Sequence, residues 1–177
     1  MNSPFVHAFY LAVRVASIGA LNFVLIPEGF AASKMRLNEI QVIGTHNSYK
    51  KAIPEKLLSL LRWYDRGLAN TLDYELLPLE QQILDHNVRH IELDLYADPD
   101  GGHYRFRRGL IAVGLDPDSR QERLRRPGFK VLHVQDIDFE SHCYTFLECL
   151  KKLQLITSQR PGHLPLTIFI EIKQSPI

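Results

Sequence analysis

The feature that most constrains the fold is a set of four β-rich runs separated by stretches with helical periodicity. The β-rich runs cover residues 39–45, 89–96, 130–134 and 167–172. The helical patterns cover residues 54–63, 78–87 and 144–155. Two of these helical patterns begin with a proline, which is tolerated in the first turn of a helix. Strands that alternate with helices are typical of a parallel sheet with crossover helices, so we expect an α/β fold.

The composition is that of a soluble globular protein and narrows the classes of partner. Hydrophobic residues make up 45% of the 177 residues and charged residues 23%, which excludes disordered, collagen-like and coiled-coil classes. Lys and Arg number 21 against 20 Asp and Glu, a net charge of +1. No overall field therefore attracts the chain to nucleic acid, and we expect no nucleic-acid partner.

Residues 1–33 are predicted to be a signal peptide. The apolar run Val15–Ile26 follows a single basic residue, Arg14, and is shorter than the roughly 20 residues that a membrane-spanning helix needs. Small residues then occur in Phe30–Ser33, as at a signal-peptidase site. We therefore expect a secreted protein, extracellular or periplasmic. An uncleaved anchor and an N-terminal helix of the domain are the alternatives, because residues 4–13 are also apolar.

The two cysteines are too few for a disulfide framework, and no CxxC or Cys/His cluster indicates a zinc site. Cys143 and Cys149 would lie about 240° apart on a continuous helix. A bridge between them therefore requires Cys143 to precede the helix, and a pair of buried thiols is the alternative.

Polar side chains recur near the carboxyl end of each β-rich run, at intervals of about 40 residues that leave room for one crossover helix. The first run is followed by His46 and Asn47, the second carries Glu92 and Asp94, the third ends at His133 and the fourth carries Glu171. In parallel α/β folds the carboxyl ends of the strands hold the active site. These residues are therefore candidates for one site.

Glu92 and Asp94 are two positions apart on a strand, so both side chains point to the same face. Two buried carboxylates repel each other, and a divalent cation relieves that repulsion. Together with Glu171, and with Asn47 as a neutral oxygen ligand, they favour Ca²⁺ or Mg²⁺ over zinc. Ion pairs of this acidic pair with Arg89 or Lys173 are the alternative.

His46 and His133 are the candidate acid–base groups. Histidine titrates near neutral pH, so two of them can serve as base and acid in phosphoryl transfer. The alternative is that each is a hydrogen-bonded structural histidine at the end of a strand.

Four segments of the chain together resemble the calcium-dependent phosphatidylinositol-specific phospholipase C-like family of secreted microbial enzymes. They are Ile43-Gly-Thr-His-Asn-Ser-Tyr49, Ile91-Glu-Leu-Asp94, Val131-Leu-His133 and Ile170-Glu-Ile-Lys173. The resemblance extends over residues 39–173, and it includes Cys143 with Cys149. Glycerophosphodiester phosphodiesterases have a similar acidic motif, but their first motif has Arg after His where this chain has Asn47.

The resemblance implies a TIM-type (β/α) barrel that cleaves the glycerol–phosphate bond of phosphoinositides through a cyclic inositol phosphate. It implies His46 as base and His133 as acid, and Lys173 as a phosphate partner in the substrate site. It also implies that a Ca²⁺ cofactor is held by Asn47, Glu92, Asp94 and Glu171.

The length of the chain adds an expectation about completeness. A (β/α)₈ barrel needs at least ~200 residues and eight strands, so residues 34–177 are expected to be the N-terminal half of the barrel, truncated after about four strands. We expect such a fragment to show little activity by itself. A non-catalytic remnant of the barrel is accordingly one alternative function, and a glycerophosphodiester phosphodiesterase is another.

Residues 105–130 are rich in positive charge, with eight basic against three acidic side chains. A basic loop beside an active-site mouth can rest on anionic lipid. We therefore expect a peripheral membrane-surface contact through this segment, with an ordinary solvated loop as the alternative.

Overall fold

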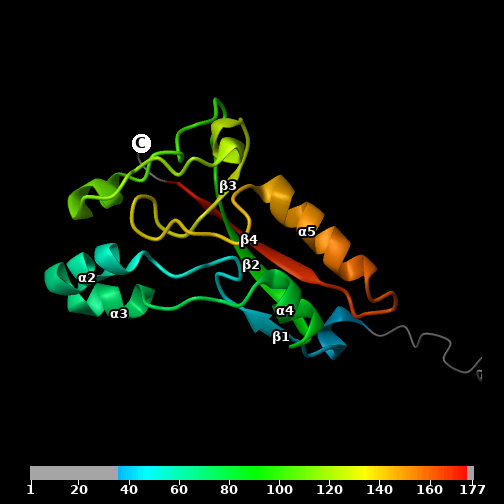
Figure 1. Ribbon diagram of the computed structural model, residues 1–177. Helices are drawn as coiled ribbons and strands as arrows, with labels where there is room; N and C mark the ends of the chain where they lie inside the picture. Colours follow the sequence, from blue (N-terminus) through cyan, green and yellow to red (C-terminus); the bar gives the residue numbers. More distant parts are fainter. Residues whose placement is uncertain (1–35, 175–177) are drawn as a thin grey trace, which may run out of the picture. The chain divides into compact units, whose positions relative to one another are not determined.

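The structure is a computed structural model that describes residues 36–174 (Figure 1). It divides into two units, of which the first ends at Gln41 and the second begins at Val42. The described part of the first unit holds a short 3-10 helix, η1 (Leu37–Glu39). The expected signal peptide, residues 1–33, lies outside the described residues. Among residues 36–174, no helix has the length and apolar character needed to span a membrane.

The second unit is built on a four-stranded sheet whose central strand is β2 (Val88–Tyr96). β1 (Ile43–Thr45) runs parallel to the first half of β2. β4 (Thr167–Lys173) runs parallel to β2 from His90 to Tyr96. β3 (Lys130–Val131) pairs with the last two residues of β2 and is antiparallel. The expected α/β class is confirmed, with three parallel strands and one short antiparallel strand.

The expectation of a parallel strand over residues 130–134 is wrong in both direction and length. The chain between β2 and β3 forms turns and two 3-10 helices, η2 (Arg108–Val113) and η3 (Glu122–Arg125). A parallel neighbour needs a long crossover, usually an α-helix, that carries the chain back to the start of the sheet. Because these residues contain only turns and 3-10 helices, the chain stays at the carboxyl end of β2. It reaches the next parallel strand, β4, only after helix α5 (Phe146–Ser158).

The helices predicted from periodicity are confirmed as α2 (Glu55–Tyr64), α4 (Leu79–Leu84) and α5. A further helix, α3 (Arg66–Leu72), was not expected. Its first turn is capped by the Asp65 side chain, which accepts a hydrogen bond from the Leu68 amide at 2.9 Å. Short polar side chains at this position satisfy backbone N–H groups that have no partner within the helix.

The main core lies between one face of the sheet and helices α4 and α5 (Figure 1). Alternate residues of β2 point into it, and its fully buried members include Ile91, Leu93, Cys143 and Cys149. The two cysteines form a disulfide. Cys143 precedes the first residue of α5, Phe146, so the bridge meets the geometric condition that the spacing imposed. Because successive strand residues alternate, Glu92 and Asp94 point to the opposite face.

A smaller core joins α2 and α3 to η2 and to the turn before α5. Leu57, Leu58 and Leu61 of α2 pack against Leu110 of η2 and against Phe139. The α2–α3 pair is therefore a packed unit inserted between the end of β1 and the start of α4. The segment after α3 contacts the loop of His46 and Asn47, because the Tyr74 hydroxyl accepts a hydrogen bond from Asn47.

Candidate active site

The loop after β1 is tied directly to β2. Asn47 adopts a left-handed backbone conformation, with φ of 49°, which asparagine tolerates better than most residues. In this conformation its backbone amide donates to Glu92 Oε2 at 2.9 Å. The Ser48 amide donates to the Glu92 carbonyl oxygen, and the Ser48 hydroxyl accepts from the Glu92 amide at 2.9 Å. The motifs at residues 43–49 and 91–94 are therefore joined by hydrogen bonds.

Three carboxylates from β2 and β4 gather on the face of the sheet that α4 and α5 leave open. Asp94 and Glu171 are direct neighbours in the parallel register, and one carboxylate oxygen from each of Glu92, Asp94 and Glu171 lies within 4.8 Å of the others. Asp94 is fully buried, and its oxygens have no well-aligned hydrogen bond from the described residues, although its Oδ2 lies near the Lys173 ammonium. A buried carboxylate that is compensated only in part can accept a further cationic partner.

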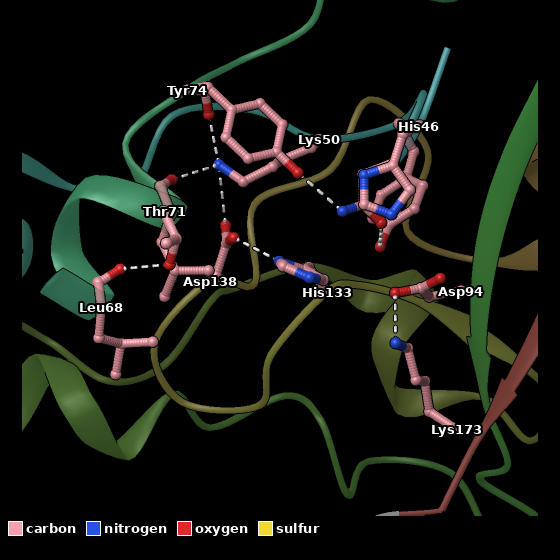
Figure 2. Close-up of polar contacts among 12 residues, drawn as sticks. His46, Lys50, Leu68, Thr71, Tyr74, Asp94, His133, Asp138 and Lys173 are labelled. Atoms are coloured by element: carbon pink, nitrogen blue, oxygen red, sulfur yellow. Dashed lines mark hydrogen bonds and ion pairs between the residues drawn. The ribbon is translucent and has the colours of Figure 1, made fainter. Parts of the chain in front are cut away.

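The charge of this cluster is only partly compensated. Lys173 Nζ lies 2.8 Å from Glu171 Oε1 and 3.3 Å from Asp94 Oδ2 (Figure 2). Burial raises the pKa of Asp94, and Glu171 adds to this, although Lys173 acts in the opposite direction. Burial by itself would lower the pKa of Lys173, but its two carboxylate neighbours raise it. Three carboxylates and one ammonium leave an excess of negative charge that a further cation would offset.

Hard divalent cations bind several carboxylate and carbonyl oxygens, and the cluster offers this donor set. The incompletely compensated carboxylate of buried Asp94 and the close approach of Glu92 and Glu171 fit such an ion. The expected amide ligand, Asn47, lies beside this group. Its Oδ1 accepts a hydrogen bond from the Tyr49 hydroxyl at 3.2 Å, and its Nδ2 donates to the Tyr74 hydroxyl at 2.7 Å. One lone pair of Oδ1 thus remains for a further contact.

His46 lies at the mouth of the carboxylate cluster. Its Nε2 is 3.3 Å from Glu92 Oε2, and 73% of its side chain is exposed. An open hollow beside it is lined by Gly44, Thr45, His46, His90, Glu92 and Phe169. The His46 ring is therefore held at one nitrogen and is accessible to a substrate that enters from this side.

The His133 ring contacts the buried carboxylate of Asp138, a residue that was not among the predicted site residues. Its Nδ1 lies 2.8 Å from Asp138 Oδ2, and its carbonyl oxygen accepts a hydrogen bond from the Tyr96 hydroxyl at 2.9 Å. In Figure 2 the His133 ring extends from Asp138 toward the side where Asp94 lies. A histidine whose Nδ1 contacts a carboxylate presents its Nε2 for proton transfer.

Lys50 completes this arrangement. Its ammonium lies 3.4 Å from Asp138 Oδ1, and neither side chain is exposed to solvent. Lys50 also donates to the carbonyl oxygen of Leu72 and to that of Tyr74 (Figure 2). A buried carboxylate is costly unless it is paired, and Lys50 is the cation that pairs with Asp138 beside His133. The sequence held one weak signal for the contact between His133 and Asp138, since Asp138 follows His133 by only five residues. The structure places the two in one short turn.

The structure therefore brings Glu92, Asp94 and Glu171 into one cluster, with His46 and Asn47 on its border and Lys173 within it. Lys173 was expected to contact phosphate, but its ammonium is paired with two carboxylates of the cluster. Arg89, the alternative ion-pair partner of the acidic residues, instead donates to the carbonyl oxygens of Ile83 and Val88 on the other face.

A comparison with known protein families agrees with this geometry. The family described as "Phosphoinositide phospholipase C, Ca2+-dependent" matches residues 35–177, most of the chain. The chain belongs to this family. No curated protein and no solved structure matches the chain. The resemblance read from the four motifs is thus confirmed, and family membership indicates a phospholipase C type of hydrolase.

Proposed function

We propose that the protein is a Ca²⁺-dependent phosphodiesterase that cleaves the glycerol–phosphate bond of phosphoinositides, within a TIM-type (β/α) barrel. The observation that carries the proposal is the placement of His46 on Glu92, at the edge of the three-carboxylate cluster. An acid–base group beside an oxygen-rich cation site is suited to phosphodiester cleavage, because it combines proton transfer with charge stabilisation. The strands β1, β2 and β4 are parallel neighbours, and their polar residues lie near their carboxyl ends, as in a barrel of this type; this supports the proposed barrel.

The cation site is formed by Glu92, Asp94 and Glu171, with Asn47 at its border. A Ca²⁺ ion bound there supplies positive charge to the phosphate oxygens and lowers the pKa of the attacking hydroxyl. Lys173 shares these carboxylates in the present structure. Once released from one of them, its ammonium reaches toward the same phosphate, which is the role that the family resemblance implies for it.

His46 acts as the general base. It takes the proton of the inositol 2-hydroxyl, whose oxygen attacks phosphorus, and the phosphorus–oxygen bond to glycerol breaks as the cyclic phosphate forms. His133 acts as the general acid and gives its proton to the departing glycerol oxygen, so that diacylglycerol leaves neutral. Asp138, buried and held by Lys50, stabilises the protonated His133 before this transfer.

The test is release of water-soluble inositol phosphate from phosphatidylinositol micelles by the chain within a completed barrel, with Ca²⁺ or with chelator; residues 34–177 alone are expected to show little turnover. His46→Ala and His133→Ala should each lower turnover by roughly 10²- to 10⁴-fold, while Ca²⁺ binding measured by calorimetry stays nearly unchanged. Glu92→Gln should weaken Ca²⁺ binding and turnover together, because it removes a ligand charge. Chelator-resistant turnover, or full turnover in His133→Ala, would contradict the mechanism.

Two alternatives give different results in the same assay. A non-catalytic remnant would bind Ca²⁺ with the expected dependence on Glu92 and release no product. A glycerophosphodiester phosphodiesterase would cleave a deacylated glycerophosphodiester and leave intact phosphatidylinositol unchanged.

We also propose that the protein is exported, since the apolar run Val15–Ile26 and the small residues after it have the pattern of a cleaved leader. The Cys143–Cys149 disulfide supports an oxidising compartment. Mass spectrometry of the protein recovered from a secreting host should show the loss of about 30 residues, the length of an ordinary signal peptide. An intact Met1 on soluble cytosolic protein would contradict export.

A further inference from the structure

The basic segment at residues 105–130 is mostly neutralised by its own surroundings. Six of its cations form ion pairs: Arg105–Asp118, Arg107–Glu140, Arg120–Asp116, Arg123–Glu148, Arg125–Glu122 and Lys130–Asp98. Charge counted along the sequence therefore overstates the free charge of this segment. A surface that binds a membrane would instead combine cations that have no ion-pair partner with exposed apolar side chains.

Such a place exists where the end of this segment meets helix α5. An open groove of about 620 Å³ lies between the turn at residues 126–129 and the outer side of α5. Three large apolar side chains border it with exposed fractions of 44% for Phe129, 61% for Leu147 and 66% for Leu155. Leu147, Lys151 and Leu155 are spaced by four residues and so form one stripe of the helix. Exposed apolar side chains that gather beside one groove mark binding surfaces more often than scattered ones do.

The groove is also positively charged. Its lining includes Arg123, Arg126, Lys151 and Lys152, against the single acidic residue Glu148. Glu148 pairs with Arg123 and Lys152, so Arg126 and Lys151 have no ion-pair partner among residues 36–174. An occupant with an anionic group and an adjoining apolar portion would complement both features.

The groove cannot be part of the candidate active site. α5 packs on the face of β2 that carries Ile91 and Leu93, whereas Glu92 and Asp94 point to the other face. A molecule in the groove is thus separated from the carboxylate cluster by the sheet. The groove is a second site, and its ligand need not be the molecule that is cleaved.

We propose that this groove, bounded by residues 126–129 and the Leu147–Lys151–Leu155 stripe, docks the protein on an anionic phospholipid surface. Arg126 and Lys151 receive lipid headgroup charge, and Leu147 and Leu155 enter the acyl boundary. The proposal rests on the proposed function for its choice of a lipid, because an enzyme that cleaves phosphoinositides works at a membrane. A second copy of the chain is a poorer fit, since two like-charged grooves would repel each other and a stable interface needs about 20–30 residues a side.

The test is co-sedimentation of the full chain with phosphatidylcholine vesicles that do or do not contain phosphatidylserine, in the presence of chelator so that no turnover occurs. Each basic residue near an anionic surface contributes roughly fivefold to binding. Arg126→Gln with Lys151→Gln should therefore weaken binding to the anionic vesicles by about 25-fold and leave binding to phosphatidylcholine unchanged. The matched control is Lys56→Gln on α2, an exposed cation with no ion-pair partner among the described residues, and it should bind as the parent does.

A second readout separates this surface from the other exposed apolar patch, at the end of α2, where Trp63 is 83% and Tyr64 81% exposed. Trp63 is the only tryptophan of the chain, so its emission reports on that patch alone. We expect no blue shift of Trp63 emission on vesicle binding. A blue shift with the double variant still bound would overturn the proposal in favour of the α2 end. Equal binding of double variant and parent, or a dimer that the double variant abolishes, would overturn it as well. Failure of phosphatidylinositol cleavage would remove the proposed function while leaving this binding difference intact.

Discussion

Replacement of Lys173 by glutamine should strengthen Ca²⁺ binding, because the lysine competes with the ion for the same oxygens. Lys173 Nζ lies 2.8 Å from Glu171 Oε1 and 3.3 Å from Asp94 Oδ2. A divalent cation that binds these carboxylates must displace the ammonium or share them with it. In either case the neutral variant removes an unfavourable contribution from the bound state.

The size of the effect follows from these distances and from solvent exposure. Two unit charges 4 Å apart attract by about 1 kcal/mol in water and about 4 kcal/mol at an effective dielectric constant of 20. The Glu171 side chain is 45% exposed, so we take the lower part of this range. We expect Lys173→Gln to raise Ca²⁺ affinity by about tenfold, equivalent to roughly 1.4 kcal/mol.

Titration calorimetry of the full chain with Ca²⁺ measures this directly. Lys173→Arg, which keeps the charge, should change the affinity little. Lys152→Gln, which removes a lysine paired with Glu148 on α5, controls for net charge and should have no effect. Asp94→Asn should weaken binding strongly. An unchanged or weaker affinity in Lys173→Gln would mean that the ion does not bind at these carboxylates, and the assignment of the site would fail.

Three further results are expected. Asp138→Asn should lower turnover by roughly 10²-fold or more and the free energy of unfolding by about 3–5 kcal/mol, because buried Lys50 loses its carboxylate partner. Adding Lys50→Met should recover part of the melting temperature but not turnover, since it also removes the hydrogen bonds of Lys50 to Leu72 and Tyr74. Full activity of either variant would contradict the role given to Asp138. Cys149→Ser should cost about 2 kcal/mol, seen in denaturant unfolding, and reductant should destabilise the parent but not the variant. Gly109→Ala should cost about 1–3 kcal/mol in thermal unfolding, since a Cβ there would lie 2.1 Å from a backbone carbonyl oxygen; an unchanged melting temperature would show that the turn can shift.

Much of the local structure could be predicted because it depends on the repeat of a single element. The alternation of residues 89–96 predicted β2 and placed Glu92 and Asp94 on one face, and leucines at helical spacing predicted α2. The short helix α3 escaped prediction because seven residues give too little periodicity, and its main signal is the capping side chain of Asp65. The direction of β3 escaped because a two-residue strand carries no information about its partner.

In the candidate site, too, some features could be predicted from the sequence and others could not. Strand-end position was enough to nominate His46 and the acidic residues, whereas His133 was nominated from a parallel strand that the structure does not form. The sequence could not show that Asp138 supports His133, because that contact depends on a tight turn and on a lysine 88 positions earlier in the chain. Nor could a count of basic residues show which cations are free, since their partners Glu140 and Glu148 lie beyond the segment that was counted.

The sequence by itself determined the order of strands and helices, the common face of Glu92 and Asp94, and the motifs that define the family. These properties follow from backbone geometry and residue type within short windows. The tertiary structure decided that β4 lies directly beside β2, which brings Glu171 next to Asp94. It also decided that Lys50 is buried against Asp138 and that an uncompensated basic groove remains on α5. Such pairings join residues far apart in the chain, and they are selected by the burial of apolar faces and the pairing of buried charges rather than by any local pattern.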